Sequence, residues 1–167
     1  MQQHRAVSSD RSSQAPERTL RTGTGEATAE AEIRELLDDW IAAVRAQDVD
    51  RIVSHYAPDI LAFDAVSQLR FNGVDAYKEH WRKCLALSPG PMIFEIHDVD
   101  IVAGDDVAFC HCLNRCGATL NNGGEKTSWM RGTIGYRKTE GRWLVVHEHW
   151  SAPFDIASGK ALFDLQP

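Results

Sequence analysis

The hydrophobic period of the chain changes at a Ser-Pro-Gly-Pro segment, residues 88–91, and this change limits the fold more than any other feature. Before the segment, apolar side chains recur every three or four residues, as in the stripe Ile33, Leu36, Leu37, Trp40, Ile41 and Val44. That spacing is typical of an amphipathic helix. After the segment, apolar and polar side chains alternate, which is typical of strands. Helices followed by consecutive strands predict an α+β fold.

Turn and capping residues give approximate bounds for the elements. Three helices are expected, over about residues 28–46, 48–57 and 76–87. One short strand is expected between the second and third helices, over about 60–64. Four longer strands follow, over about 92–103, 106–120, 125–138 and 142–151. Because short polar turns separate these four strands, we predict an antiparallel meander whose one face is covered by the helices.

Residues 1–27 differ in composition from the rest of the chain. They are rich in Ser, Thr, Arg, Gln and Gly and hold few large apolar side chains. Ordering such a segment costs entropy that little burial would offset, so we expect a disordered tail. The other residues, 28–167, are enough for one domain.

The charge balance argues against two classes of partner. The chain has 18 Lys and Arg against 24 Asp and Glu, a net charge of −6, so we expect neither nucleic acid nor a membrane surface as a partner. No secretory signal pattern opens the chain, and no apolar run approaches the roughly 18 residues of a membrane span. With four Cys at spacings that do not indicate a zinc site, a reduced, cytoplasmic protein is the expectation.

Four segments together resemble the nuclear transport factor 2-like superfamily, in its SnoaL-like and ketosteroid-isomerase-like branch. They are AAVRAQDVDRIVSHYAPDILAFD (42–64), FNGVDAYKEHW (71–81), GDDVAFCHCLNR (104–115) and GRWLVVHEHWSAPFDIASGKALFDLQP (141–167). The resemblance covers about residues 28–167 and includes a His-Glu-His-x-Ser-x-Pro ending. It implies a cone-shaped α+β fold, in which a strongly curved antiparallel sheet wraps around N-terminal helices and leaves an apolar pocket. It also implies a homodimer through the outer sheet face and no cofactor.

Asp64 is the first candidate for chemistry. In ketosteroid isomerases a string like YAPDILAFD ends in a carboxylate that moves a proton, and the resemblance places Asp64 there. Independently, a carboxylate at the end of an apolar strand that faces a hydrophobic cavity loses hydration and becomes a stronger base. The competing interpretation is a strand-end Asp that caps a turn. The isomerase positions for two oxyanion donors hold Trp40 and about Gly132, which argues against steroid isomerisation itself.

The strand expected over 106–120 offers replacement donors. Alternation puts His111 and Arg115 on one face and the neighbouring cysteines on the other. The resemblance places the His111 and Arg115 face inside the cone, where both side chains would stabilise an oxyanion. The competing interpretations are a hydrogen-bonded core histidine and a surface ion pair of Arg115.

The last strand divides its side chains between two faces. Period 2 separates Glu148 and Trp150 from the two flanking histidines, and the resemblance places Glu148 and Trp150 inside. The side chains expected to bind a ligand in the pocket are Trp40, Tyr56, Trp81, Glu148 and Trp150. Those expected at the outer face or rim are Trp129, Arg131, His147 and His149. A His-x-His pair also has metal-ligand spacing, but we expect no metal.

These observations predict a cofactor-independent acid/base enzyme of the isomerase, cyclase or dehydratase type. Its substrate would be a small hydrophobic molecule that bears a carbonyl group, with Asp64 moving the proton and His111 and Arg115 stabilising the oxyanion. The alternative is a domain without catalytic activity that binds a small ligand or associates with a second copy.

Overall fold

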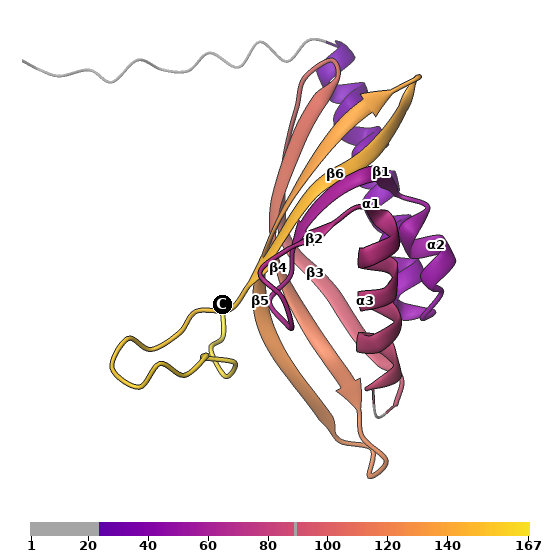
Figure 1. Cartoon of the computed structure of the whole chain (residues 1–167). Coiled ribbons are helices and arrows are strands. Elements are labelled where there is room, and N and C mark those ends of the chain that lie inside the picture. The colour runs from indigo at the N-terminus through magenta and orange to yellow at the C-terminus, as the bar shows by residue number, and fades with distance from the viewer. Residues whose placement is uncertain (1–23, 89) are drawn as a thin grey trace, which may run out of the picture.

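The computed structural model describes residues 24–88 and 90–167. Its three helices are α1 (Thr24–Arg45), α2 (Val49–Val53) and α3 (Val74–Ala86). Its six strands are β1 (Tyr56–Phe63), β2 (Phe71–Asn72), β3 (Met92–Ala103), β4 (Val107–Thr119), β5 (Glu125–Thr139) and β6 (Arg142–Ser151). The strands form one curved sheet with the helices packed against its concave side, which confirms the predicted α+β cone (Figure 1). None of the helices in the described ranges is long and apolar enough to cross a membrane.

Two predicted boundaries near the N-terminus were wrong. Helix α1 begins at Thr24 and not at residue 28, in an alanine-rich segment with high helix propensity in which Ala29 is already buried. Helix α2 ends at Val53, and Tyr56 starts β1 rather than continuing the helix. Of the tail expected over 1–27, residues 1–23 lie outside the described residues, and 24–27 belong to α1.

In the sheet, β1 lies beside β6, the last strand of the chain. The strand order of the sheet is β2-β1-β6-β5-β4-β3. Strands β3 to β6 form the predicted antiparallel meander, but β1 pairs in parallel with β6, with Phe63 beside His149. The parallel pairing was not predicted. It brings Asp64, which directly follows β1, next to the end of β6.

A bulge in β6 decides which side chains face the helices. Tyr136 of β5 pairs with Val145, whereas the next residue toward the start of β5, Gly135, pairs with His147, so Val146 is an extra residue in β6. Val145 and Glu148 are therefore both buried although they are three residues apart. Glu148 and Trp150 face the core, as predicted.

Aromatic side chains fill the space between the helices and the sheet. Trp40 of α1 is stacked on Trp150 of β6, with ring centroids 6.1 Å apart. Trp81 of α3 and Phe94 of β3 meet the Trp40 ring edge to face, at 5.9 and 5.4 Å. Such edge-to-face and offset contacts are the preferred arrangement of aromatic rings. One cluster therefore holds α1, α3 and the sheet together.

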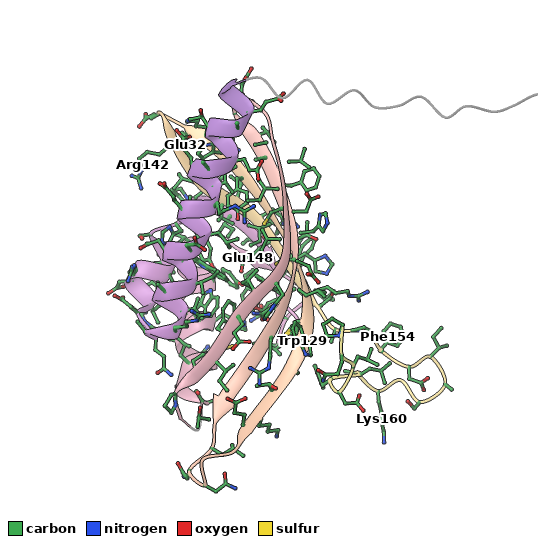
Figure 2. All side chains as sticks on the ribbon, turned by 180° about the vertical axis from the view of Figure 1, so that it is seen from behind. Glu32, Trp129, Arg142, Glu148, Phe154 and Lys160 are labelled. Atoms are coloured by element: carbon green, nitrogen blue, oxygen red, sulfur yellow. The ribbon has the colours of Figure 1, made fainter. Side chains whose placement is uncertain are left out.

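The C-terminal arm, residues 152–167, leaves the sheet at the end of β6 and projects away from it (Figures 1 and 2). A bridge between Phe154 and Ala161 closes the arm on itself. The indole Nε1 of Trp129 donates to Gln166 Oε1 at 3.1 Å, which attaches the arm to β5. Phe154 and Ile156 are nevertheless 64% and 89% exposed. The arm thus carries apolar side chains that its own domain does not cover.

Gly132→Ala tests how closely β5 packs on Trp150. A Cβ atom at position 132 would lie 2.3 Å from Cζ3 of Trp150, so the indole must move. We expect the free energy of unfolding to fall by about 1–3 kcal/mol, measured by urea denaturation. Gly135→Ala on the same strand is the control, because its Cβ would meet the His147 Cβ at an ordinary 3.6 Å. Equal stability of the two variants would contradict this packing.

Candidate functional site

The carboxyl group of Glu148 lies at the centre of the molecule, between the helices and the sheet (Figure 2). Its side chain is buried, with Glu148 only 1% exposed. Oε1 accepts a hydrogen bond from Trp150 Nε1 at 3.0 Å and is contacted by the hydroxyls of Tyr56, at 3.4 Å, and of Tyr77. Oε2 has no hydrogen-bond partner among the described residues. All the donors therefore converge on one oxygen atom.

Two indole N–H groups determine in which direction the Tyr56 hydroxyl donates its proton. Trp40 Nε1 and Trp81 Nε1 both donate to the Tyr56 oxygen, at 3.0 and 3.1 Å. An indole N–H can only donate, so these two bonds use the accepting positions of the hydroxyl. Its proton is then directed to Glu148. The five side chains predicted to bind a ligand thus form one connected network at the centre of the cone.

Asp64 and His80 form a second polar group beside this network. Asp64 Oδ2 lies 3.2 Å from His80 Nε2 and 3.2 Å from the Tyr77 hydroxyl. Its other oxygen, Oδ1, accepts from the backbone N–H of Val66 at 3.0 Å. Asp64 therefore also caps the turn after β1, as the competing interpretation proposed. One carboxylate oxygen serves the turn and the other faces the buried side chains of α3.

The charges of the two groups follow from their surroundings. Burial alone would lower the pKa of His80, but hydrogen bonds to Asp64 and to the Cys84 sulfur raise it to about 9. Burial raises the pKa of Glu148 to about 7, although the bonds from Tyr77 and Trp150 lower it. Near neutral pH, His80 is consequently a cation, and Glu148 is close to its titration midpoint.

A cavity of about 160 Å³ lies against the Asp64 and His80 pair. Its wall is mostly apolar and includes Trp81, Phe94 and Trp150. A second cavity of about 720 Å³ adjoins it and shares Trp81 and Phe94. An apolar cavity with a few convergent polar groups is the usual form of a small-molecule site.

The predicted positions of His111 and Arg115 were wrong. Both lie on the outer face of β4, where the His111 side chain is 57% exposed and lies 3.7 Å from Asp100. Arg115 forms ion pairs with Glu95 at 3.2 Å and Glu125 at 2.5 Å, as its competing interpretation proposed. The small, weakly polar side chains of β4 face the helices instead, and burying a charged Arg there would leave it without compensation. Neither residue reaches the cavity.

Tyr77 and His80 are the site residues that sequence reasoning missed. They lie on the inner face of α3, where Tyr77 is three residues before His80 and four before Trp81. Helical spacing puts Tyr77 and His80 on the same side of α3 as Trp81, facing the core. Their role becomes visible only when α3 is packed against Asp64 and Glu148, because helical spacing does not show which strand end they meet.

The four residues predicted at the outer face or rim lie on β5 and β6. His147 contacts the Leu61 carbonyl through Nδ1 at 2.6 Å and packs against Phe63. The other three are partly or fully exposed: Trp129, Arg131 and His149. Across the described ranges, no group of three or more His, Cys, Asp or Glu side chains is arranged to hold a metal ion.

Comparison with known proteins agrees with this fold. The profile of the SnoaL-like domain matches residues 33–155. An NTF2-like protein of unknown function from Pseudomonas putida KT2440 is 48% identical over 84% of this chain and 98% of its own, with a TM-score of 0.80. No match was found among the curated proteins.

More distant structures share the fold alone. One is described as a candidate dehydratase of the NTF2-like family from Streptomyces avermitilis, with 14% identity, a TM-score of 0.67, and coverage of 75% of this chain and 97% of that one. Another is the association domain of CaMKII from C. elegans, with 16% identity, a TM-score of 0.64, and coverage of 77% and 99%. The cone with a polar centre defines an NTF2-like α+β protein. Within that class, the chain belongs to the SnoaL-like domain family.

Glu148→Gln tests the protonation of the buried carboxyl. The pKa of Glu148 is about 7 in the folded protein against 4.5 as its ordinary value, so the folded state binds this proton more tightly than the unfolded state. The contribution of Glu148 to stability is therefore highest below about pH 4.5 and falls as the pH rises to about 7. The loss amounts to on the order of 3 kcal/mol.

Because glutamine does not ionise, the Glu148→Gln protein should gain stability relative to wild type between pH 5 and pH 8. Urea denaturation across that range measures the difference. Asp59→Asn, at an exposed carboxylate that pairs with Arg137 on the outside, is the control and should show no such trend. A constant difference between Glu148→Gln and wild type would show that Glu148 is not protonated in the folded protein.

Proposed function

We propose that the chain is a cofactor-independent acid/base enzyme of the isomerase, cyclase or dehydratase type, acting on a small hydrophobic molecule that bears a carbonyl group. The observation that carries this proposal is the Asp64 and His80 pair on the wall of the smaller cavity. A base and a cation within 3.2 Å of each other are the two groups that proton abstraction next to a carbonyl requires.

Asp64 would remove the proton from the substrate carbon. His80 takes the role that the sequence had assigned to His111 and Arg115, because its positive charge lies at the same cavity wall as the base. An oxyanion that forms on the substrate carbonyl would be stabilised by this charge, and the apolar wall formed by Trp81, Phe94 and Trp150 would strengthen the attraction by keeping water out.

Proteins with the same fold have other roles, and one of these roles is the alternative to the enzyme. The association domain of CaMKII shares the fold, so a domain that binds a small ligand or a second copy without chemistry is the competing proposal. The candidate dehydratase among the structural neighbours supports the enzyme. The charged pair at a cavity wall favours the enzyme further, because a domain that served association alone would not need it.

Asp64→Asn tests the proposed base. Exchange of carbon-bound protons adjacent to the carbonyl is followed by proton NMR in D₂O, with small cyclic ketones and β-hydroxyketones as probes. We expect Asp64→Asn to slow exchange on the order of 10²–10⁴-fold, because the amide keeps the volume but accepts no proton. Asp59→Asn is the matched control on the outside of β1. Equal rates in Asp64→Asn and wild type would contradict the assignment and favour the binding domain.

We also propose that the chain forms a homodimer through the outer face of its sheet. That face carries Phe109 of β4, which is 46% exposed, beside the polar and aromatic side chains of the rim. The uncovered apolar side chains of the C-terminal arm lie at the same edge of the molecule as the end of β6 (Figure 2). Aromatic and arginine side chains are enriched where protein surfaces meet, which supports this face as the contact.

Phe109→Asp tests the dimer. A charge at the centre of the contact should weaken association by about tenfold or more, measured by sedimentation equilibrium at micromolar concentration. Leu87→Asp, at an exposed apolar residue that ends α3 on the opposite side, is the control. A wild-type chain that sediments as a monomer would disprove the dimer, and a dimer insensitive to Phe109→Asp would place the contact elsewhere.

A further inference from the structure

The hydroxyl of Tyr77 joins two carboxyl groups. It is within hydrogen-bond range of Glu148 Oε1 and of Asp64 Oδ2. A tyrosine hydroxyl has one proton to donate and can also accept. When both carboxyl groups are ionised, only one of them receives the Tyr77 proton. When Glu148 is protonated, Glu148 can donate to Tyr77 while Tyr77 donates to Asp64, and both hydrogen bonds are made.

The other contacts of Glu148 leave Tyr77 as the path for a proton. Trp150 can only donate to Oε1. The Tyr56 oxygen already accepts from Trp40 and Trp81, so it cannot take a proton from Glu148. Of the three described partners of Oε1, Tyr77 alone touches a second carboxyl group. A chain Glu148–Tyr77–Asp64–His80 therefore runs from the core to the cavity wall.

The charges along this chain favour one location for a proton. The His80 cation lies beside Asp64 and stabilises its carboxylate. No cation among the described residues forms an ion pair with Glu148. The titratable groups that influence Glu148 or are influenced by it are Asp64, Tyr56, Tyr77, Cys110, Cys112 and Tyr136. Burial raises the pKa of each of these tyrosines and cysteines, so they stay neutral. A single proton shared by the two carboxyl groups therefore resides on Glu148.

We propose that Asp64 and Glu148 act as one proton-sharing pair through Tyr77, and that Glu148 stores the proton that Asp64 removes from the substrate. The storing role rests on the proposed function, whereas the sharing of a proton does not. Asp64 takes the proton from carbon, and the electron pair of that bond moves to the substrate carbonyl. The new Asp64 O–H then passes its proton to the Tyr77 oxygen while the Tyr77 O–H passes its own to Glu148 Oε1. Two O–H bonds break and two form, and Asp64 is a carboxylate again.

Storage at Glu148 has two consequences for a reaction that returns the proton to another atom of the substrate. The stored proton is held on a buried side chain and not at the cavity wall, because Glu148 is 1% exposed. Asp64 meanwhile keeps its charge next to His80, so the pair at the cavity wall is unchanged while the substrate rearranges. The reverse transfer through Tyr77 then delivers the proton to the product. Glu148 and Tyr77 act through Asp64 and are positioning residues, not catalytic ones.

A pH titration of the full chain without ligand tests the sharing. Infrared spectra report the carboxyl bands, and the band of each residue is assigned by its loss in Asp64→Asn or Glu148→Gln. We expect Asp64→Asn to lower the Glu148 midpoint by on the order of one pH unit, because the charge of Asp64 raises the pKa of Glu148 and coupled groups titrate as a pair. A Glu148 midpoint that does not change in Asp64→Asn would overturn the proposal.

Tyr77→Phe tests the bridge itself. It removes the hydroxyl and keeps the ring that stacks on His80. The effect of Asp64→Asn on the Glu148 midpoint should then be smaller than in the protein that keeps the Tyr77 hydroxyl, because only the charge effect through space is left. Tyr136→Phe is the matched control, because Tyr136 is equally buried but its hydroxyl contacts the Cys110 sulfur at 3.6 Å and no carboxyl group. An effect of Asp64→Asn on the Glu148 midpoint that is as large in Tyr77→Phe as in the wild-type background, or that falls equally in Tyr136→Phe, would overturn the bridge. If Tyr77→Phe does not fold by circular dichroism, the Asp64→Asn comparison decides.

The storing role has its own measurement. With a ketone that the wild type exchanges, Tyr77→Phe should lower kcat about tenfold or more above pH 7, where Glu148 is ionised and can accept, and should leave KM unchanged. Below pH 6 the two proteins should differ little. A loss of kcat that is the same at every pH would overturn storage. If no ketone is exchanged, the proposed function fails while the titration without ligand still decides whether the proton is shared.

Discussion

Burial of one carboxyl group, that of Glu148, is the interaction on which the rest of the centre depends. A carboxylate taken out of water costs several kcal/mol unless donors replace the lost hydration. Here the donors come from three elements: Trp150 from β6, Tyr56 from β1 and Tyr77 from α3. Each donor must lie within hydrogen-bond distance of the Glu148 carboxyl group for its burial to be compensated. The requirement therefore sets how the last strand, the first strand and the third helix meet.

The aromatic cluster supplies that geometry. Trp40 lies on Trp150 and donates to the Tyr56 hydroxyl, so one indole both packs the core and sets the direction of a hydrogen bond. Space for Trp150 exists because residue 132 on the neighbouring strand is glycine. The apolar surface of the cavity and the polar centre are thus built from the same side chains. Shape and acid/base properties are coupled in this fold.

The sequence predicted the fold well because hydrophobic periodicity is a local property. The switch of period at residues 88–91 was enough to give helices before strands. Alternation along the last strand separated Glu148 and Trp150 from the flanking histidines, and the family resemblance placed these two side chains inside, where they are buried. The same alternation did not tell which face of β4 is inner, and His111 and Arg115 were placed on the wrong one. Alternation shows which side chains share a face of a strand, but it does not show which of the two faces is buried.

Other parts of the site depend on contacts that no local pattern contains. The parallel pairing of β1 with β6 joins segments that no turn connects, and the bulge at Val146 shifts the alternation by one residue. The partnership of His80 with Asp64 arises from packing α3 on the end of β1. Asp64 was identified from its position at the end of an apolar strand, whereas its partner required the three-dimensional arrangement.

The pairing of the first long strand with the last also bears on how the chain folds. Tyr56 and Glu148 meet across 92 residues of sequence, and closing so long a loop costs entropy before any contact is gained. On a ribosome, α1, α2 and β1 emerge long before β6 exists to pair with them. Their apolar faces stay exposed, or are covered by a chaperone, until the strand that carries Glu148 is made. Closure of the sheet and assembly of the acid/base centre are then a single late event, so a chain truncated before β6 lacks both.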